Sequence, residues 1–142
     1  MGDDMHLLLN ALENNENAHI FSNTSKELHE TKTRSLLELE LSQDATIDLL
    51  TKLKEFIYVD EIPDIKLGSF IKWIPLSNPD KIKLTNGAIV CDILIAENGT
   101  LIKCKNFRNK FILVNVEKAL IYRKLSNQEK ILISVSNYLN NA

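Results

Sequence analysis

The fold of this chain is decided by residues 81–105, which read KIKLTNGAIVCDILIAENGTLIKCK. Two Asn-Gly dipeptides, Asn86-Gly87 and Asn98-Gly99, each separate runs in which apolar and polar residues alternate. Such a dipeptide between alternating runs is the strongest short-range signal for a tight β-hairpin. The segment therefore predicts three antiparallel strands joined by two tight turns.

The two turns also predict which side chains share a face of the sheet. With Asn-Gly at the centre of each turn, Ile95 lies opposite Ile102, and Asp92 lies opposite both Lys81 and Lys105. One face then collects Ile82, Leu84, Ile89, Cys91, Ile93, Ile95, Ile102 and Cys104. The other collects Lys81, Lys83, Asp92, Lys103 and Lys105. Because a slip by one residue would bury the lysines, we expect the first face to be a core and the second to be exposed.

Further short strands are expected around this segment, and together they suggest a small barrel. The expected strands span 69–74, 81–85, 88–96, 101–106, 111–116 and 119–123. Strands this short and closely spaced favour a small barrel over a sandwich. The sequence thus predicts an α+β fold in which N-terminal helices pack on a small antiparallel β-barrel, SH3-like, Sm-like or OB-like, followed by a C-terminal helix.

The helical predictions rest on apolar spacing and on capping boxes. They comprise a short helix over 3–14, a helix starting at the capping box of Thr24 to Glu27, an amphipathic helix over 42–58, and a terminal helix opened by Ser126 to Glu129. An early strand at 36–41 is the alternative for the second of these. We expect an acidic, mainly helical segment at 1–62, the barrel at 63–125 and the terminal helix at 126–142, forming one compact domain.

Charge is distributed unevenly along the chain. The net charge of −2 combines twelve acidic and five basic residues in 1–60 with seven acidic and twelve basic residues in 61–142. Such asymmetry suggests an acidic or nucleic-acid partner for the basic half, the alternative being that the two halves neutralise each other.

The candidate binding site combines the predicted basic face with the residues that follow it. Cations for phosphates, interleaved with an exposed aromatic ring for base stacking, are typical of single-stranded nucleic-acid platforms. The predicted nucleic-acid-binding residues are Lys81, Lys83, Lys103, Lys105, Phe107, Arg108 and Lys110. The alternative is a solvated basic face, with Phe107 and Phe111 in the core. Trp73 is expected to anchor the core.

No catalytic or metal-binding pattern accompanies this site, so the sequence predicts a non-enzymatic protein without cofactor or metal. Cys91 and Cys104 are expected to be reduced, buried and too far apart for a disulfide. The histidines, His6, His19 and His29, have no cysteine near them in the sequence and are expected on the surface. The carboxylates Asp60, Glu61 and Asp64 fit a charged loop at a helix end.

The remaining expectations concern location and partners. No apolar run approaches the roughly 20 residues needed to cross a bilayer, and the start of the chain is acidic, so we expect a soluble intracellular protein without membrane contact. The expected function is an interaction module that binds an acidic partner, either nucleic acid or a protein. The alternative is a structural or assembly protein whose 42–58 helix or terminal helix packs against a second copy or a partner subunit.

Three segments carry a resemblance to other proteins: GSFIKWIP at 68–75, LTNGAIVCD at 84–92 and YRKLSNQE at 122–129. They resemble short uncharacterised proteins of large double-stranded DNA viruses of protists. The resemblance implies a virion or infected-cell setting and no assigned activity or site. A helix followed by short strands is also similar to Sm-like proteins, although the Asn-centred turn that binds uridine there has no match around Asn106.

Overall fold

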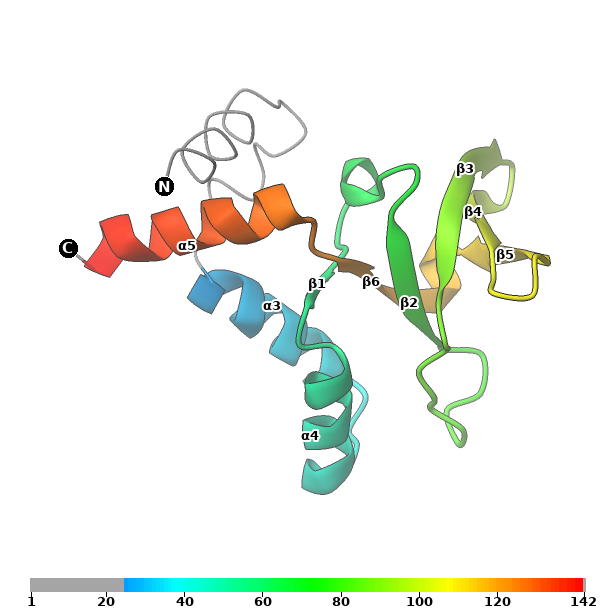
Figure 1. The fold of residues 1–142 in the computed structure, drawn as a ribbon. Coiled ribbons are helices and arrows are strands. Elements are labelled where there is room, and N and C mark those ends of the chain that lie inside the picture. The colour runs from blue at the N-terminus through cyan, green and yellow to red at the C-terminus, as the bar shows by residue number, and fades with distance from the viewer. Residues whose placement is uncertain (1–24, 142) are drawn as a thin grey trace. The chain divides into compact units, whose positions relative to one another are not determined.

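The computed structural model describes residues 25–141, which form three α-helices and one six-stranded sheet (Figure 1). The elements are α3 (Ser25–Leu37), α4 (Gln43–Lys52), β1 (Phe56–Tyr58), η2 (Ile62–Asp64), β2 (Phe70–Pro75), β3 (Ala88–Ala96), β4 (Gly99–Lys105), β5 (Phe111–Asn115), η3 (Val116–Lys118), β6 (Ala119–Lys124) and α5 (Asn127–Asn141). The α+β class is therefore confirmed. The helix predicted over 3–14 lies outside the described residues, as do Thr24, His6 and His19.

The described residues divide into two compact units. One unit contains residues 25–34 and 125–141, hence most of α3 and all of α5. The other contains Ser35–Lys124, hence α4 and the whole sheet. The candidate site lies entirely in the second unit.

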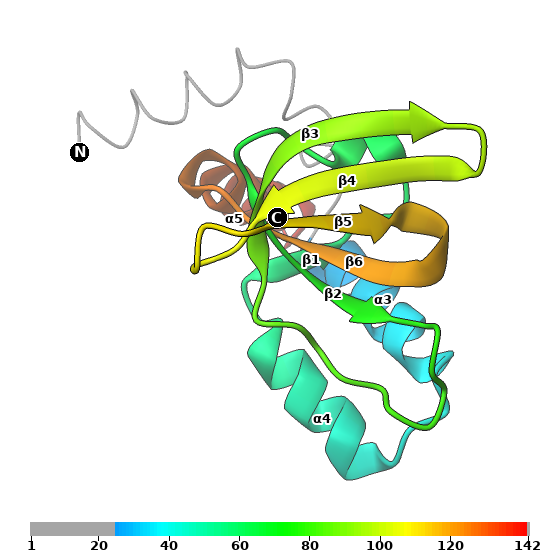
Figure 2. The ribbon, with the colours of Figure 1, turned by 90° about the vertical axis from the view of Figure 1, so that its right-hand side faces the viewer.

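The sheet is antiparallel and open, with the strand order β1-β6-β2-β3-β4-β5. Figure 2 shows β3, β4 and β5 side by side, with β6 and β2 beyond them. β1 and β5 are the two edge strands, so the sheet does not close on itself.

Two apolar clusters lie on opposite faces of this sheet, because successive side chains of a strand point to opposite sides. The face that carries Ile71 and Trp73 of β2 is called the inner face here; its buried cluster is Val59, Ile65, Ile71, Trp73, Ala88, Val90, Ile102, Cys104, Val114 and Ile121. The opposite, outer face carries the cluster Leu36, Leu49, Leu53, Phe56, Ile74, Leu120 and Tyr122. Trp73 is thus a core residue, as predicted.

Helix α4 supplies much of the outer cluster. Ser42 caps the start of the helix, since its hydroxyl accepts a hydrogen bond from the backbone N–H of Ala45 at 3.2 Å, and the helix packs Leu49 against the sheet. The helix ends at Lys52, so the prediction of a helix through residue 58 is wrong. The apolar spacing continues through 56–58, but that segment pairs with β6 as an edge strand, a long-range contact that local periodicity cannot reveal.

The alternative strand at 36–41 is also wrong. Helix α3 continues to Leu37, and the chain reverses through Glu40, which has a left-handed backbone with φ 55°. Leu36 is completely buried in the outer cluster, so it is helical packing that fixes this segment.

The Asn98-Gly99 hairpin is confirmed, but its register differs from the prediction by two residues. Ala96 pairs with Gly99, so Glu97 and Asn98 are the central turn residues. Gly99 follows the turn with φ 124°. Ile93 consequently lies opposite Ile102, and Asp92 lies opposite Lys103 in place of Lys105.

The prediction of a hairpin at Asn86-Gly87 is wrong, because residues 81–85 do not form a strand. The segment runs irregularly along β2, where the Thr85 N–H donates to the Trp73 carbonyl at 3.0 Å and the Thr85 hydroxyl accepts from the Trp73 N–H at 3.1 Å. Gly87 has φ 92°, and a Cβ there would lie 2.5 Å from Cζ of Phe70 and 2.7 Å from the Ile71 carbonyl oxygen. Glycine is needed at this position for close backbone approach to β2.

A β-bulge between Val90 and Asp92 changes the predicted faces of β3. Before the bulge Val90 is buried opposite Cys104, whereas Ile89 and Cys91 are exposed. After the bulge Ile93 packs on the inner cluster. The prediction that Ile89 and Cys91 are core residues is therefore wrong, because the bulge inserts one unpaired residue and shifts the alternation. The prediction that Ile95 is a core residue is wrong too, since its side chain is exposed near the end of the hairpin.

The second predicted capping box is confirmed at the start of α5. The Ser126 N–H donates to Oε1 of Glu129 at 2.9 Å, and the Glu129 N–H donates to the Ser126 hydroxyl at 3.2 Å. This reciprocal pair satisfies backbone donors at the helix start, which local sequence alone can specify.

Candidate nucleic-acid interface

Two of the predicted lysines lie on the outer face of β4 beside an exposed ring. Lys103 and Lys105 alternate with the buried Ile102 and Cys104, as the sequence predicted. Their Nζ atoms lie 4.5 and 5.8 Å from the ring centroid of Phe111 on β5. Both ammonium groups are therefore held over one aromatic ring by cation–π attraction.

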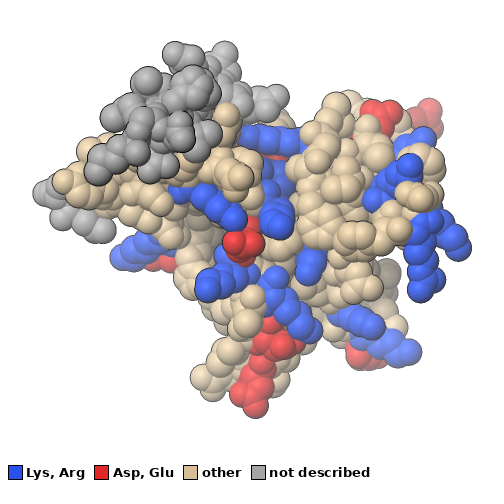
Figure 3. Space-filling view, viewed as in Figure 1, with Lys and Arg blue, Asp and Glu red and all other residues tan. Residues whose placement is uncertain are grey.

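The outer face of β3, β4 and β5 is a mixed apolar and cationic surface. A row of paired positions crosses it from Phe70 through Ile89 and Lys105 to Phe111. Ile89 is 42% exposed, Phe111 58% and Leu113 57%. Groups of blue Lys and Arg side chains separated by tan surface are visible on the face drawn in Figure 3.

The loop between β4 and β5, residues 106–110, is built around Asn106. The side-chain oxygen of Asn106 accepts from the N–H groups of Arg108 at 2.9 Å and Lys110 at 3.0 Å. Its backbone N–H donates to the Lys110 carbonyl at 3.0 Å, and Asn109 turns the chain with φ 59°. This short loop is therefore ordered by its own hydrogen bonds.

Phe107 is presented by that loop and is 81% exposed. Its ring centroid lies 6.1 Å from that of Phe70 in a tilted arrangement, and Phe70 in turn lies 6.0 Å from Phe56. Both Phe107 and Phe111 are exposed, which excludes the alternative that they belong to the core. One ring side of Phe107 is thus braced by a half-buried aromatic neighbour.

A pocket of about 430 Å³ opens beside Phe107. It is lined by Trp73, Thr85, Asn86, Gly87, Asn106, Phe107, Arg108 and Ile112. The irregular segment along β2 and the β4–β5 loop therefore form its two walls. It combines an exposed ring, a guanidinium and two side-chain amides in a volume ordinary for small-ligand sites.

The structure does not bring all seven predicted residues together. Lys103, Lys105, Phe107, Arg108 and Lys110 lie on β4 and the loop that follows it. Lys81 and Lys83 lie on the irregular segment along β2, and Lys83 lines a different pocket next to α4. The predicted pairing of Lys81 with Asp92 is wrong because residues 81–85 form no strand, and the role of both lysines in nucleic-acid contact stays a prediction.

All charged side chains of the β4–β5 hairpin are positive. Residues 98–116 contain Lys103, Lys105, Arg108 and Lys110 but no Asp or Glu. Asp92 is the residue opposite Lys103, and its carboxylate accepts a hydrogen bond from the N–H of Ile93 at 2.8 Å. The hairpin therefore retains an excess of positive charge.

Trp73, Asn86 and Phe70 were not among the predicted site residues. The nearness of Asn86 to Phe107 depends on the path of the irregular segment along β2, which differs from the predicted hairpin. The sequence signal that could have indicated it is Gly87, if it is interpreted as a close-approach glycine as well as a turn residue.

The two cysteines differ sharply. Cys104 is fully buried on the inner face, and burial, with a smaller contribution from Cys91, raises the pKa of its thiol to about 11. Cys91 is exposed, whereas the prediction placed it in the core. Both cysteines are free thiols, as expected. Over residues 25–141, no three His, Cys, Asp or Glu side chains are placed to hold a metal ion. Within the same range no helix has the length and apolar character to span a bilayer.

Comparison with known proteins yields no match to a protein-family model, to a curated protein or to a solved structure.

Proposed function

We propose that this chain is a non-enzymatic module that binds single-stranded nucleic acid. The proposed interface is Lys103, Lys105, Phe107, Arg108 and Lys110, together with Phe111. The observation that carries the proposal is that the exposed ring of Phe107 lines, together with Arg108, a pocket of about 430 Å³ next to a basic hairpin whose residues 98–116 contain no Asp or Glu.

The chemistry of the two parts is complementary. The cations would neutralise phosphates without regard to sequence. The exposed Phe107 ring would stack on a base, a contact that contributes about 1–3 kcal/mol per base. The amide of Asn86 supports the pocket as a place where a base edge could be hydrogen-bonded. A single strand is favoured over a duplex because only unpaired bases offer their faces to a ring.

We further propose that the open sheet is a variant of the small barrel expected from the sequence. Support comes from the inner cluster, in which side chains of β2, β3, β4, β5 and β6 meet. In small barrels, too, side chains from one face of every strand fill a common interior.

Salt dependence of binding tests the proposed function. A fluorescein-labelled single-stranded 20-mer, titrated by anisotropy, should bind with an affinity that falls with added salt. Four neutralised phosphates predict a slope of log affinity against log salt of about −3, at about −0.7 per phosphate for single strands. Because Trp73 is the only tryptophan and lines the pocket, its fluorescence should change on binding.

Two pairs of variants test whether binding depends on the proposed interface or only on the overall charge of the protein. The double variant Lys103→Glu and Lys105→Glu should lose at least tenfold in affinity. Its matched control, Lys54→Glu and Lys118→Glu, changes two exposed lysines elsewhere and should lose much less. Phe107→Ala should weaken binding about five- to a hundredfold, whereas Tyr138→Ala on α5 should not. Equal losses in variant and control, or binding that ignores salt, would overturn the proposal. Equally tight competition by polyglutamate would point to an acidic protein partner instead.

A second candidate function, assembly through a helix, is favoured by the exposed apolar side chains of α5. Tyr138 is 76% exposed and Leu139 is 62% exposed. Adjacent exposed apolar residues mark possible contact sites between chains. Light scattering across a hundredfold range of concentration tests this: a constant monomer mass contradicts it, and a dimer that Tyr138→Ser with Leu139→Ser abolishes supports it.

A further inference from the structure

A second pocket, which shares only Thr85 and Asn86 with the pocket beside Phe107, lies between α4 and the irregular segment along β2. Its volume is about 420 Å³, within the range of small-molecule sites. It is lined by Leu41, Ala45, Asp48, Leu49, Lys52, Lys72, Ile82, Lys83, Leu84, Thr85 and Asn86. These residues come from three stretches of sequence, and only Lys83 was among the predicted binding residues.

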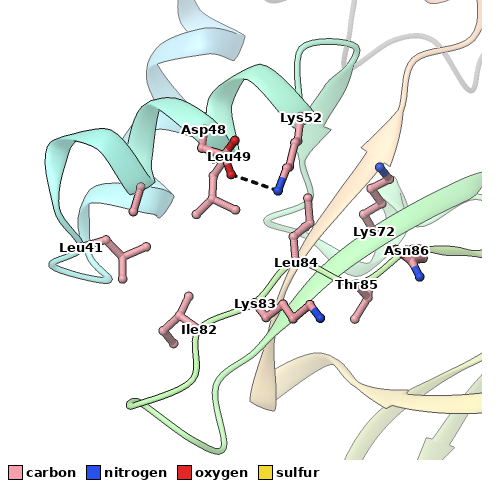
Figure 4. Close-up of a pocket in the computed structure, with 11 residues that line it drawn as sticks. Leu41, Asp48, Leu49, Lys52, Lys72, Ile82, Lys83, Leu84, Thr85 and Asn86 are labelled. Carbon is pink, nitrogen blue, oxygen red and sulfur yellow. Dashed lines mark ion pairs between the residues drawn. The ribbon is translucent and has the colours of Figure 1, made fainter.

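The lining of this pocket is divided by polarity. Figure 4 shows Leu41, Leu49 and Ile82 toward one end, and the nitrogen atoms of Lys52 and Lys72 toward the other. Lys83 points the same way from the segment beside Leu84. The pocket therefore offers an aliphatic wall and, toward its other side, three lysine side chains.

The charge balance at the polar end is positive. Asp48 forms an ion pair with Lys52 at 3.0 Å and offsets one of the three lysines. Lys72 is held by the ring of Phe56, whose centroid lies 5.5 Å from its Nζ atom. The lining residues thus carry three cations against one carboxylate, and two of the cations come from the sheet side of the pocket.

We infer that this pocket binds a small amphiphilic anion, namely an aliphatic chain that ends in a carboxylate. The chain would lie against Leu41, Leu49 and Ile82, where each methylene that is buried is removed from water. The head group would lie among the ammonium groups of Lys52, Lys72 and Lys83. An apolar wall without aromatic side chains fits a flexible hydrocarbon chain better than a flat base, and this separates the pocket from the one beside Phe107.

Octanoate is a suitable probe, with 1-octanol and inorganic phosphate as matched partial ligands. Amide chemical shifts of the ¹⁵N-labelled full chain would be followed during each titration. Octanoate should give saturable shifts confined to 41–52, 72 and 82–86. 1-Octanol lacks the charge and phosphate lacks the chain, so each should bind at least tenfold more weakly than octanoate.

Charge removal tests the polar end of the pocket. Lys72→Met with Lys83→Met keeps the aliphatic stems and removes two charges, so octanoate affinity should fall at least tenfold. The matched control, Lys54→Met with Lys124→Met, removes two exposed charges elsewhere and should leave the affinity within about twofold. The exposed single variant Lys83→Met should lie between the two, and it gives a readout even if the change at Lys72 disturbs the fold.

Three results would overturn the inference: octanoate shifts spread over the surface, octanoate binding unchanged by the lysine variants, or phosphate or 1-octanol binding as tightly as octanoate. The inference is independent of nucleic-acid binding. The Lys103→Glu and Lys105→Glu variant should keep octanoate affinity even where it loses nucleic acid.

Discussion

The two halves of the outer sheet face differ in what covers them. Over β1, β6 and β2 the face is buried by apolar side chains, among them Leu49 of α4 and the fully buried Tyr122. Over β3, β4 and β5 the same face carries Lys103, Lys105 and exposed apolar residues. One continuous face is thus used for stability at one end and left accessible at the other.

This contrast indicates where binding can be added without loss of the fold. Removing a buried side chain leaves a cavity, whereas removing an exposed one costs little. The open half can therefore carry variable, functional side chains such as Phe111 and Leu113.

The largest expected effect of a single change lies in the covered half. Leu53, which is completely buried, should cost about 2–5 kcal/mol of unfolding free energy when changed to Ala. Leu113→Ala in the open half should cost less than about 1 kcal/mol, because Leu113 is 57% exposed. Urea unfolding of both variants measures the difference. Similar losses would contradict the division of the face.

A change at the border between the halves should come next in size. Gly87→Ala would place a Cβ 2.5 Å from Phe70 and 2.7 Å from the Ile71 carbonyl oxygen, at φ 92°. We expect a loss of about 1–3 kcal/mol, from strain at this backbone conformation together with the clash. At Gly99, where the nearest atom would be 3.4 Å away in the Glu117 side chain, the cost should be smaller. Thermal unfolding of the two variants compares them, and an equal shift would contradict the close-approach role of Gly87.

A smaller effect is expected from the polar contact within the covered half. The hydroxyl groups of Ser35 and Tyr122 lie 2.7 Å apart in a buried hydrogen bond. Ser35→Ala should cost about 1–2 kcal/mol, because it removes the hydrogen-bond partner of a buried hydroxyl. In the Tyr122→Phe background the same change should cost clearly less. A double-mutant cycle by chemical denaturation gives the coupling, and zero coupling would mean that the bond does not contribute.

The smallest expected effect concerns the reactivity of the two cysteine thiols and not the stability of the fold at neutral pH. In the native chain at pH 8, iodoacetamide should label the exposed Cys91 and leave Cys104 unlabelled, whereas both should react in urea. Mass spectrometry of the labelled peptides measures this. Rapid native labelling of Cys104 would contradict its burial.

The buried thiol of Cys104 predicts that the stability of the fold depends on pH above neutrality. The pKa of Cys104 is raised from 9.0 to about 11, so the folded chain holds this proton more tightly than the unfolded chain. Its contribution to stability is therefore complete below pH 9 and is lost as the pH rises from 9 to about 11. The burial-raised pKa values of Tyr58 and Tyr122 act in the same direction. Cys104→Ala should show a shallower decline than the natural chain in unfolding midpoints over this range.

Local signals in the sequence predicted the features that depend on local chemistry. The capping box of Ser126 and Glu129, the Asn98-Gly99 hairpin and the alternation of Lys103 and Lys105 with buried neighbours were all recognisable. Each of these depends on residues within a few positions of one another. The lysines and the apolar residues of β4 lie on opposite faces as predicted, although the register differs by two residues. An even shift leaves every side chain on the same face.

The features that could not be predicted depend on distant partners. Strand β1 requires β6, more than 60 residues away, and the path of Thr85 requires the backbone of Trp73. The pocket beside Phe107 exists because of that path. The bulge at Cys91 was not recognisable either, because apolar residues occupy successive positions both before it, at Ile89 and Val90, and after it, at Ile93 and Leu94.

The bulge at Cys91 has a consequence for comparing this chain with future relatives. The two parts of β3 follow different inside–outside frames, so a homologue with a regular strand would align correctly only with a one-residue gap placed there. A deletion at this single position would join the two frames into one regular strand.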